Sequence, residues 1–189
     1  MSRLSLPLAL FALALSACAV SEEFITDPAI PVRPTTVPGL ALSETGVGLV
    51  DNATGFSASA ISKALNGARV EQVNATDDGR VVRQLAAFGP SGLQMARFRG
   101  SNGLVTSVQI VSEDVPSPDG VRVGMTYRST NCNAMQCNEG AGSWTGMAVC
   151  RRLGSTITYV YSVPLWQGGA MPRGNELNDA ILNRMIWEP

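Results

Sequence analysis

Histidine is missing from the 189-residue sequence, and lysine occurs once, at position 63. Without histidine there is no Ser-His-Asp triad, no Cys-His pair and no ordinary general base near neutral pH. A Ser–Lys dyad would have to join Lys63 to its neighbour Ser62, but adjacent helix positions do not face each other. The acidic pairs at 77–78 and 113–114 stand beside turn signals, which favours a role in turns. We therefore expect no catalytic residues.

Charge is sparse and nearly balanced, with 14 basic and 15 acidic residues and a formal net charge of −1. Removal of a leader that contains Arg3 would leave 13 basic and 15 acidic residues, a formal net charge of −2. Such a chain has no basic stripe for nucleic acid and no polybasic segment for anionic lipid. Its cysteines, without any histidine, are an incomplete set for a structural zinc site. We expect no metal, no cofactor and no nucleic-acid partner.

The chain has one apolar run, residues 4–15, which is shorter than the roughly 20 residues that a spanning helix needs. Arg3 precedes this run and small residues end it, as in a secretory signal. The tetrapeptide Leu15-Ser16-Ala17-Cys18 resembles the bacterial lipobox, in which the cysteine sulfur carries a diacylglyceryl group. We predict a signal peptide over 1–17 and lipidation of Cys18. The alternative is an ordinary signal peptide with a chance cysteine.

A lipidated Cys18 would attach the protein to a membrane. Buried acyl chains contribute about 0.8 kcal/mol per methylene, so two or three chains anchor a protein durably. Ala19 follows the cysteine, where an aspartate would mark retention in the inner membrane. We expect an outer-membrane anchor with the domain facing the periplasm.

Residues 18–39 contain Pro28, Pro31, Pro34 and Pro38, a density that favours an extended spacer. A proline-rich docking motif is the alternative. The rest, residues 40–189, is long enough for a single domain with its own core.

Two helices and a series of strands are predicted within this domain. Ser57 is a plausible N-cap for a helix over 58–65, with Gly67 after its end. A second helix is predicted over 176–185, with Asn175 as its cap. Short alternating segments separated by turn residues predict an antiparallel, mainly β, sandwich-like domain; they are residues 69–75, 81–88, 93–99, 104–111, 144–152 and 156–163.

Aromatic residues gather in the last third of the chain. Tyr159 and Tyr161 are two residues apart and share one face of a predicted strand. Together with Trp166 they are a candidate binding surface. Core packing is the alternative.

Three cysteines follow Cys18, at positions 132, 137 and 150. An exported protein meets oxidising conditions, so one disulfide and one spare thiol are expected.

Several segments, taken in order, resemble the sigma-E-regulated envelope lipoproteins, a domain family of unknown function; they are residues 42–48, 60–67, 108–116, 120–124, 171–172 and 186–187.

This resemblance implies a mainly β, sandwich-like domain and an outer-membrane role linked to envelope stress, with no assigned enzyme activity. The family has two cysteines about a dozen residues apart, which implies a Cys137–Cys150 disulfide. Cys132 departs from that pattern and leaves open a Cys132–Cys150 pair, a buried free thiol or an intermolecular disulfide. We expect a non-catalytic envelope lipoprotein that binds a partner or supports envelope integrity. The alternatives are a carrier or sensor of lipid or glycan fragments and, in third place, an enzyme.

Overall fold

The computed structural model describes residues 40–77, 79–130 and 135–189. All of them belong to one compact unit, Val32–Pro189. The predicted signal peptide, Cys18, the proline-rich spacer and Cys132 lie outside the described residues. Within the described part, no helix is long and apolar enough to span a membrane.

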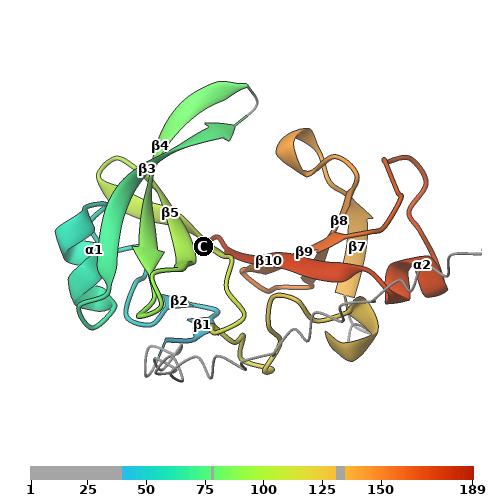
Figure 1. The fold of residues 1–189 in the computed structure, drawn as a ribbon, viewed down its shortest axis with the longest axis horizontal. Coiled ribbons are helices and arrows are strands. Elements are labelled where there is room, and N and C mark those ends of the chain that lie inside the picture. Colours follow the sequence, from blue (N-terminus) through green and yellow to red (C-terminus); the bar gives the residue numbers. More distant parts are fainter. Residues whose placement is uncertain (1–39, 78, 131–134) are drawn as a thin grey trace, which may run out of the picture. The chain divides into compact units, whose positions relative to one another are not determined.

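Eight strands form one antiparallel sheet in the order β3-β4-β5-β6-β10-β9-β8-β7 (Figure 1). This confirms a mainly β, antiparallel domain, although its strands form one continuous sheet instead of the two of a typical sandwich. A two-stranded sheet pairs β1 (Leu42–Ser43) with β2 (Gly46–Val47). The strands of the large sheet are β3 (Arg69–Asp77), β4 (Arg80–Phe88), β5 (Gln94–Ser101), β6 (Leu104–Ile110), β7 (Met135–Glu139), β8 (Met147–Arg152), β9 (Ile157–Ser162) and β10 (Ile181–Trp187).

The strands from β3 to β6 follow the predicted turns. Between β5 and β6 the chain reverses at Asn102 and Gly103, whose φ angles are 51° and 78°. Two consecutive positive φ angles are typical of a tight hairpin turn, and asparagine and glycine tolerate them best. Local turn chemistry therefore places β3 to β6 side by side in chain order.

The first predicted helix is confirmed as α1 (Ala58–Ala64). The Ser57 side chain accepts a hydrogen bond from the Ala60 amide at 3.2 Å, which satisfies one of the free N–H groups at the helix start. After the helix, the amide of Gly67 donates to the Ser62 carbonyl at 2.8 Å, with Gly67 at a φ of 84°. Ile61 is the buried residue of this helix, so the short amphipathic element is held by one apolar face.

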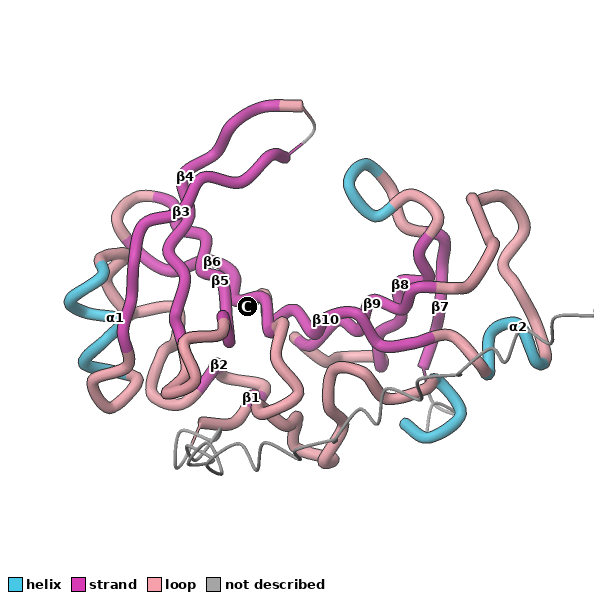
Figure 2. The backbone as a smooth tube through the Cα atoms, viewed as in Figure 1, coloured by secondary structure: helices cyan, strands magenta, loops and turns pink. Residues whose placement is uncertain are grey.

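The second predicted helix is wrong over most of its length. Only α2 (Asn175–Asn178) is helical, and the chain then forms the strand β10 from Ile181. β10 pairs with β6 on one side and β9 on the other, and Figure 2 shows how short the helical segments are. Pairing on both sides satisfies the backbone of these residues, and such tertiary context overrides their modest helix propensity.

The end of the chain also differs from the predicted strands. β7 was not predicted, and the strand expected from residue 144 begins only at Met147. Trp144 lies instead in the short 3-10 helix η3 (Gly142–Trp144).

Cross-strand register divides the large sheet into an apolar and a polar face. One row of directly opposed residues crosses all eight strands and is apolar throughout: Val70, Ala87, Ala96, Ile110, Met185, Tyr159, Cys150 and Cys137. The adjacent row points the opposite way, because successive side chains alternate. Apart from Ala86 and Ile186 it is polar, and it defines what we call the polar face: Glu71, Ala86, Arg97, Gln109, Ile186, Thr158, Arg151 and Gln136.

The apolar row belongs to the core of the domain. Residues from outside the large sheet complete that core, among them Leu42 of β1, Val47 of β2, Ile61 of α1 and Val121 of the loop after β6. An antiparallel sheet with one packed face and one polar face requires this alternation along its strands.

Glu44, in the β1–β2 turn, connects the small sheet to the large one. Its carboxylate accepts hydrogen bonds from the Thr156 amide at 2.7 Å and from the Ser155 hydroxyl at 2.8 Å. Partial burial alone would raise the pKa of Glu44, but hydrogen bonds from Thr156 and Ser155 and the charge of Arg151 lower it below the ordinary 4.5. The ionised carboxylate is therefore the form that the folded protein stabilises.

Glu44→Gln is expected to destabilise the protein most above about pH 4.5. When folding lowers the pKa of a carboxyl group, the ionised group stabilises the protein fully at any pH above its pKa in the unfolded chain. This stabilisation is lost as the pH falls through its pKa in the folded protein. The stability difference between wild type and variant should thus shrink under acid, as measured by urea unfolding across pH. Glu113→Gln, at an exposed position after β6, is the matched control. An equal difference at every pH would contradict this role for Glu44.

Candidate functional site

Two of the three aromatic residues predicted as a binding surface are buried. Tyr159 is 2% and Tyr161 0% exposed, so the prediction is wrong for both. The Tyr161 hydroxyl lies 2.8 Å from Thr130 Oγ1, and its ring packs edge-on against Tyr127 at 5.2 Å. Burial raises the pKa of Tyr159. The two-residue period correctly places both rings on one face, but it does not tell which face is buried.

Trp166, the third predicted residue, lies in the loop after β9. It is half-buried and packs against the core. It does not share a surface with the two tyrosines, because they lie inside the core.

A hollow of about 720 Å³ opens on the polar face over β7, β8 and β9. Its floor consists of two rows of directly opposed residues that are two positions apart along the strands and therefore lie on the same face. The first row contains Gln136, Arg151 and Thr158, and the second contains Asn138 and Val149. The floor therefore presents two amides, a hydroxyl and a guanidinium around one apolar side chain.

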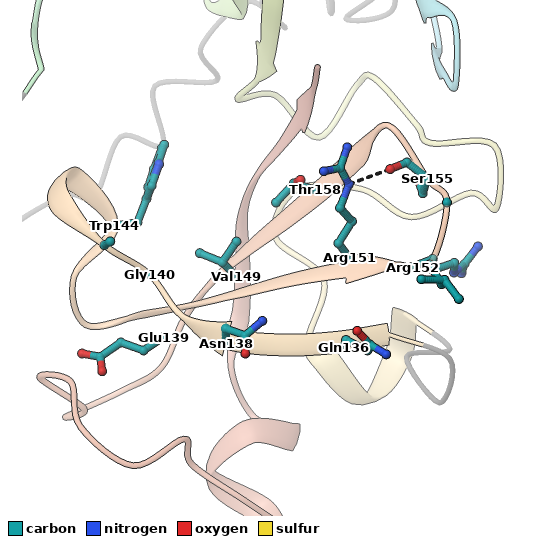
Figure 3. A pocket seen from close by; sticks show the side chains of 13 residues that line it. Gln136, Asn138, Glu139, Gly140, Trp144, Val149, Arg151, Arg152, Ser155 and Thr158 are labelled. Carbon is teal, nitrogen blue, oxygen red and sulfur yellow. Dashed lines mark hydrogen bonds between the residues drawn. The ribbon is translucent and has the colours of Figure 1, made fainter. Parts of the chain in front are cut away.

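The rim comes from two loops on either side of the floor. Trp144 stands on η3 at one end, and the β8–β9 turn, with Ser155, closes the other (Figure 3). Arg151 donates from Nε to the Ser155 carbonyl at 2.6 Å, which holds its guanidinium along that turn. At Gly140, a Cβ atom would lie 2.3 Å from the Trp144 carbonyl oxygen, so this glycine is needed for the tight approach that places Trp144.

The disulfide Cys137–Cys150 lies beneath the hollow. The two cysteines are directly opposed on β7 and β8, with 4.0 Å between their Cα atoms. This confirms the pairing implied by the family resemblance. Cys137 stands between Gln136 and Asn138, so the cross-link supports the edge strand that carries both amides of the floor.

The hollow contains few acidic groups and several hydrogen-bonding groups. Glu139 is its one carboxylate, and the Ser155 hydroxyl already donates to Glu44. Among residues 40–77, 79–130 and 135–189, no group of three or more His, Cys, Asp or Glu side chains could hold a metal ion. Amide and guanidinium groups beside an indole ring offer hydrogen bonds and stacking to a polar ligand.

Sequence reasoning missed this hollow. Its floor depends on β7, whose residues Met135–Glu139 carry only a short alternation next to the unpredicted η3. The spacing of Cys137 and Cys150 was the available signal, because cross-strand cysteine pairs require two neighbouring strands.

Comparison with known proteins gives a family but no activity. A family model described as "Protein of unknown function (DUF1131)" matches residues 33–189. The crystal structure of the uncharacterized protein yfeY from Escherichia coli is similar, with 25% sequence identity and a TM-score of 0.63. The match covers 79% of this chain and 99% of that one. No curated protein matches the chain.

Proposed function

The chain belongs to the DUF1131 family of proteins of unknown function, and we propose that it is a non-catalytic envelope lipoprotein that binds a partner through the hollow on its polar face. The observation that carries this proposal is the hollow itself, with Trp144 and Arg151 beside exposed amides. Tryptophan and arginine are the residues that most often dominate binding energy at protein interfaces.

Location supports a partner within the envelope. The lipobox-like Leu15-Ser16-Ala17-Cys18 and the resemblance to sigma-E-regulated envelope lipoproteins support an outer-membrane anchor with the domain in the periplasm. The proline-rich segment 18–39 would serve as a spacer between the anchor and the domain. The proposed role is to bind an envelope protein or support envelope integrity under stress.

A carrier of small polar ligands is the second candidate. The observation that favours it is the concavity, since about 720 Å³ lies in the range of small-molecule sites. The planar amides of Gln136 and Asn138 beside Trp144 suit the hydroxyl groups and ring faces of glycan fragments.

A photo-crosslinker at position 138 tests the partner. We expect ultraviolet light to join the anchored protein to one envelope protein in intact cells, because position 138 lies in the floor of the hollow. The adduct should fall about tenfold or more in Trp144→Ala, a typical loss for an interface hot spot, and should vanish in Cys18→Ser. Mass spectrometry of the adduct identifies the partner.

The matched control carries the crosslinker at position 81, which is also exposed but lies at the start of β4. Equal adducts from positions 81 and 138 would overturn the assignment of the hollow. Recovery of a glycan or lipid fragment from the hollow, without a protein adduct, would replace the partner with the carrier.

A further inference from the structure

Two arginines lie near each other on the polar face, at the centre of the sheet. Arg97 of β5 directly faces Gln109 of β6, which directly faces Ile186 of β10. Arg184 precedes Ile186 by two residues and therefore lies on the same face. Arg184 donates from Nη1 to Gln109 Oε1 at 3.2 Å, so Gln109 stands between the two guanidinium groups.

The ring of Trp144 holds Arg184 in place. The Arg184 guanidinium carbon lies 4.8 Å from the centre of the indole ring, and Nε donates to Asn183 Oδ1 at 3.0 Å. Stacking on an aromatic face leaves the edge of a guanidinium available for in-plane hydrogen bonds. The arrangement links this arginine pair to the rim of the hollow.

No carboxylate neutralises the pair within the part of the chain that the structure describes. In the register of the sheet, the acidic residue of this row is Glu71 on β3, separated from Arg97 by Ala86. The Glu71 carboxylate is already paired with Arg69. Burial lowers the pKa of Arg184, and the charge of Arg97 lowers it further. Arginine nevertheless stays protonated in proteins, so two like charges face each other here.

Buried polar atoms around the pair lack partners. Arg97 donates from Nη2 to Gln94 Oε1 at 3.4 Å, yet Arg97 Nε and Gln94 Nε2 have no hydrogen-bond partner. The Ser107 hydroxyl, on a side chain 4% exposed and two residues before Gln109 on the same face of β6, also has none. Buried donors without partners are rare in folded proteins and point to a bound water, ion or ligand.

We propose that Arg97 and Arg184 bind the oxyanion of a phosphate-type ligand beside Trp144. An oxyanion would neutralise two like charges and accept from the unpartnered donors of Arg97, Gln94 and Ser107. Guanidinium groups match phosphate geometry through paired hydrogen bonds. The site adjoins the hollow and has only Trp144 in common with it, and its ligand is different, so it goes beyond the proposed function. The oxyanion belongs either to a free ion or to a lipid headgroup.

The test uses the full-length protein in uncharged detergent micelles. Sodium phosphate is titrated against sodium chloride of equal ionic strength, and the Nε–H resonances of the arginines are followed by nuclear magnetic resonance. We expect the Arg97 and Arg184 resonances to shift with phosphate. Affinity should fall at least about tenfold in Arg97→Gln and in Arg184→Gln, as is typical for a lost charge-assisted hydrogen bond. A second arm adds phosphatidylglycerol to the micelles in place of phosphate.

The control variant is Arg83→Gln, since Arg83 is exposed on β4 and lies outside the polar row. Its phosphate affinity should stay within about twofold of the wild type. A response to phosphatidylglycerol alone, lost in the same two variants, would assign the oxyanion to a lipid headgroup. No response to either probe, or a response unchanged in both variants, would overturn the proposal. The wild-type spectra decide this even if a variant fails to fold, and neither result depends on the crosslinking at position 138.

Discussion

Trp187→Ala is expected to lower the free energy of unfolding by about 3–5 kcal/mol, the usual range for truncating a buried tryptophan. Trp187 is 1% exposed at the end of β10, directly opposite Ile157 of β9 and Val108 of β6. Its indole nitrogen donates to the Glu44 carbonyl at 3.1 Å. The substitution would therefore open a cavity at the centre of the sheet and break a link to the β1–β2 turn.

Urea unfolding followed by circular dichroism measures this loss, with the disulfide intact in every sample. Trp187→Phe keeps a ring but removes the hydrogen bond to Glu44, so it should cost less, about 1–2 kcal/mol. Trp144→Ala, at a half-buried rim position, should also cost less than Trp187→Ala. A loss below about 1 kcal/mol for Trp187→Ala would show that β10 does not bury its side chain as described.

Removal of the disulfide is the second large effect. The double variant Cys137→Ala with Cys150→Ala should lose about 3 kcal/mol, the chain-entropy value for a loop of roughly 15 residues. The two cysteines are 13 residues apart, and the cross-link stabilises chiefly by restricting the unfolded chain. Alanine is the suitable replacement because Cys150 is fully buried, and a serine hydroxyl there would need a partner.

Peptide mapping and a substitution of Cys132, the cysteine outside the disulfide, check the pairing independently. Peptide mapping without reduction should recover Cys137 linked to Cys150, and Cys132→Ala should leave both that link and the stability unchanged. A Cys132–Cys150 peptide from the wild type would contradict the observed pairing. Wild-type protein under strong reductant should approach the stability of the double variant.

The short-range features of the domain could be predicted from the sequence. Ser57 and Gly67 bound α1 as expected, and Asn102 with Gly103 forms the β5–β6 turn. These signals act over a few residues, where capping and backbone preference decide the conformation. The strands β3 to β6 followed from them, because consecutive hairpins pair with their sequence neighbours.

The predicted alternation failed at one point in β5. The pairing of β4 with β5 shifts register between Ala87 and Phe88, so Met95 and Ala96 are both buried although they are adjacent. A bulge adds one residue to a strand and changes which side chains share a face. Arg97 consequently lies on the polar face, although the simple alternation groups it with Leu93 and Met95.

Which strands become neighbours was decided only by the tertiary structure. Residues 181–185 have the local pattern of a helix, yet they belong to β10, which enters the sheet between β6 and β9. That position makes Arg184 a neighbour of Gln109, 75 residues away, and it buries Tyr159 and Tyr161 on the other face. Capping and turns are decided within a few residues, so the sequence alone determined them. Strand partners are chosen by burial of apolar surface over the whole domain, and the hollow and the arginine pair exist only as a result of that choice.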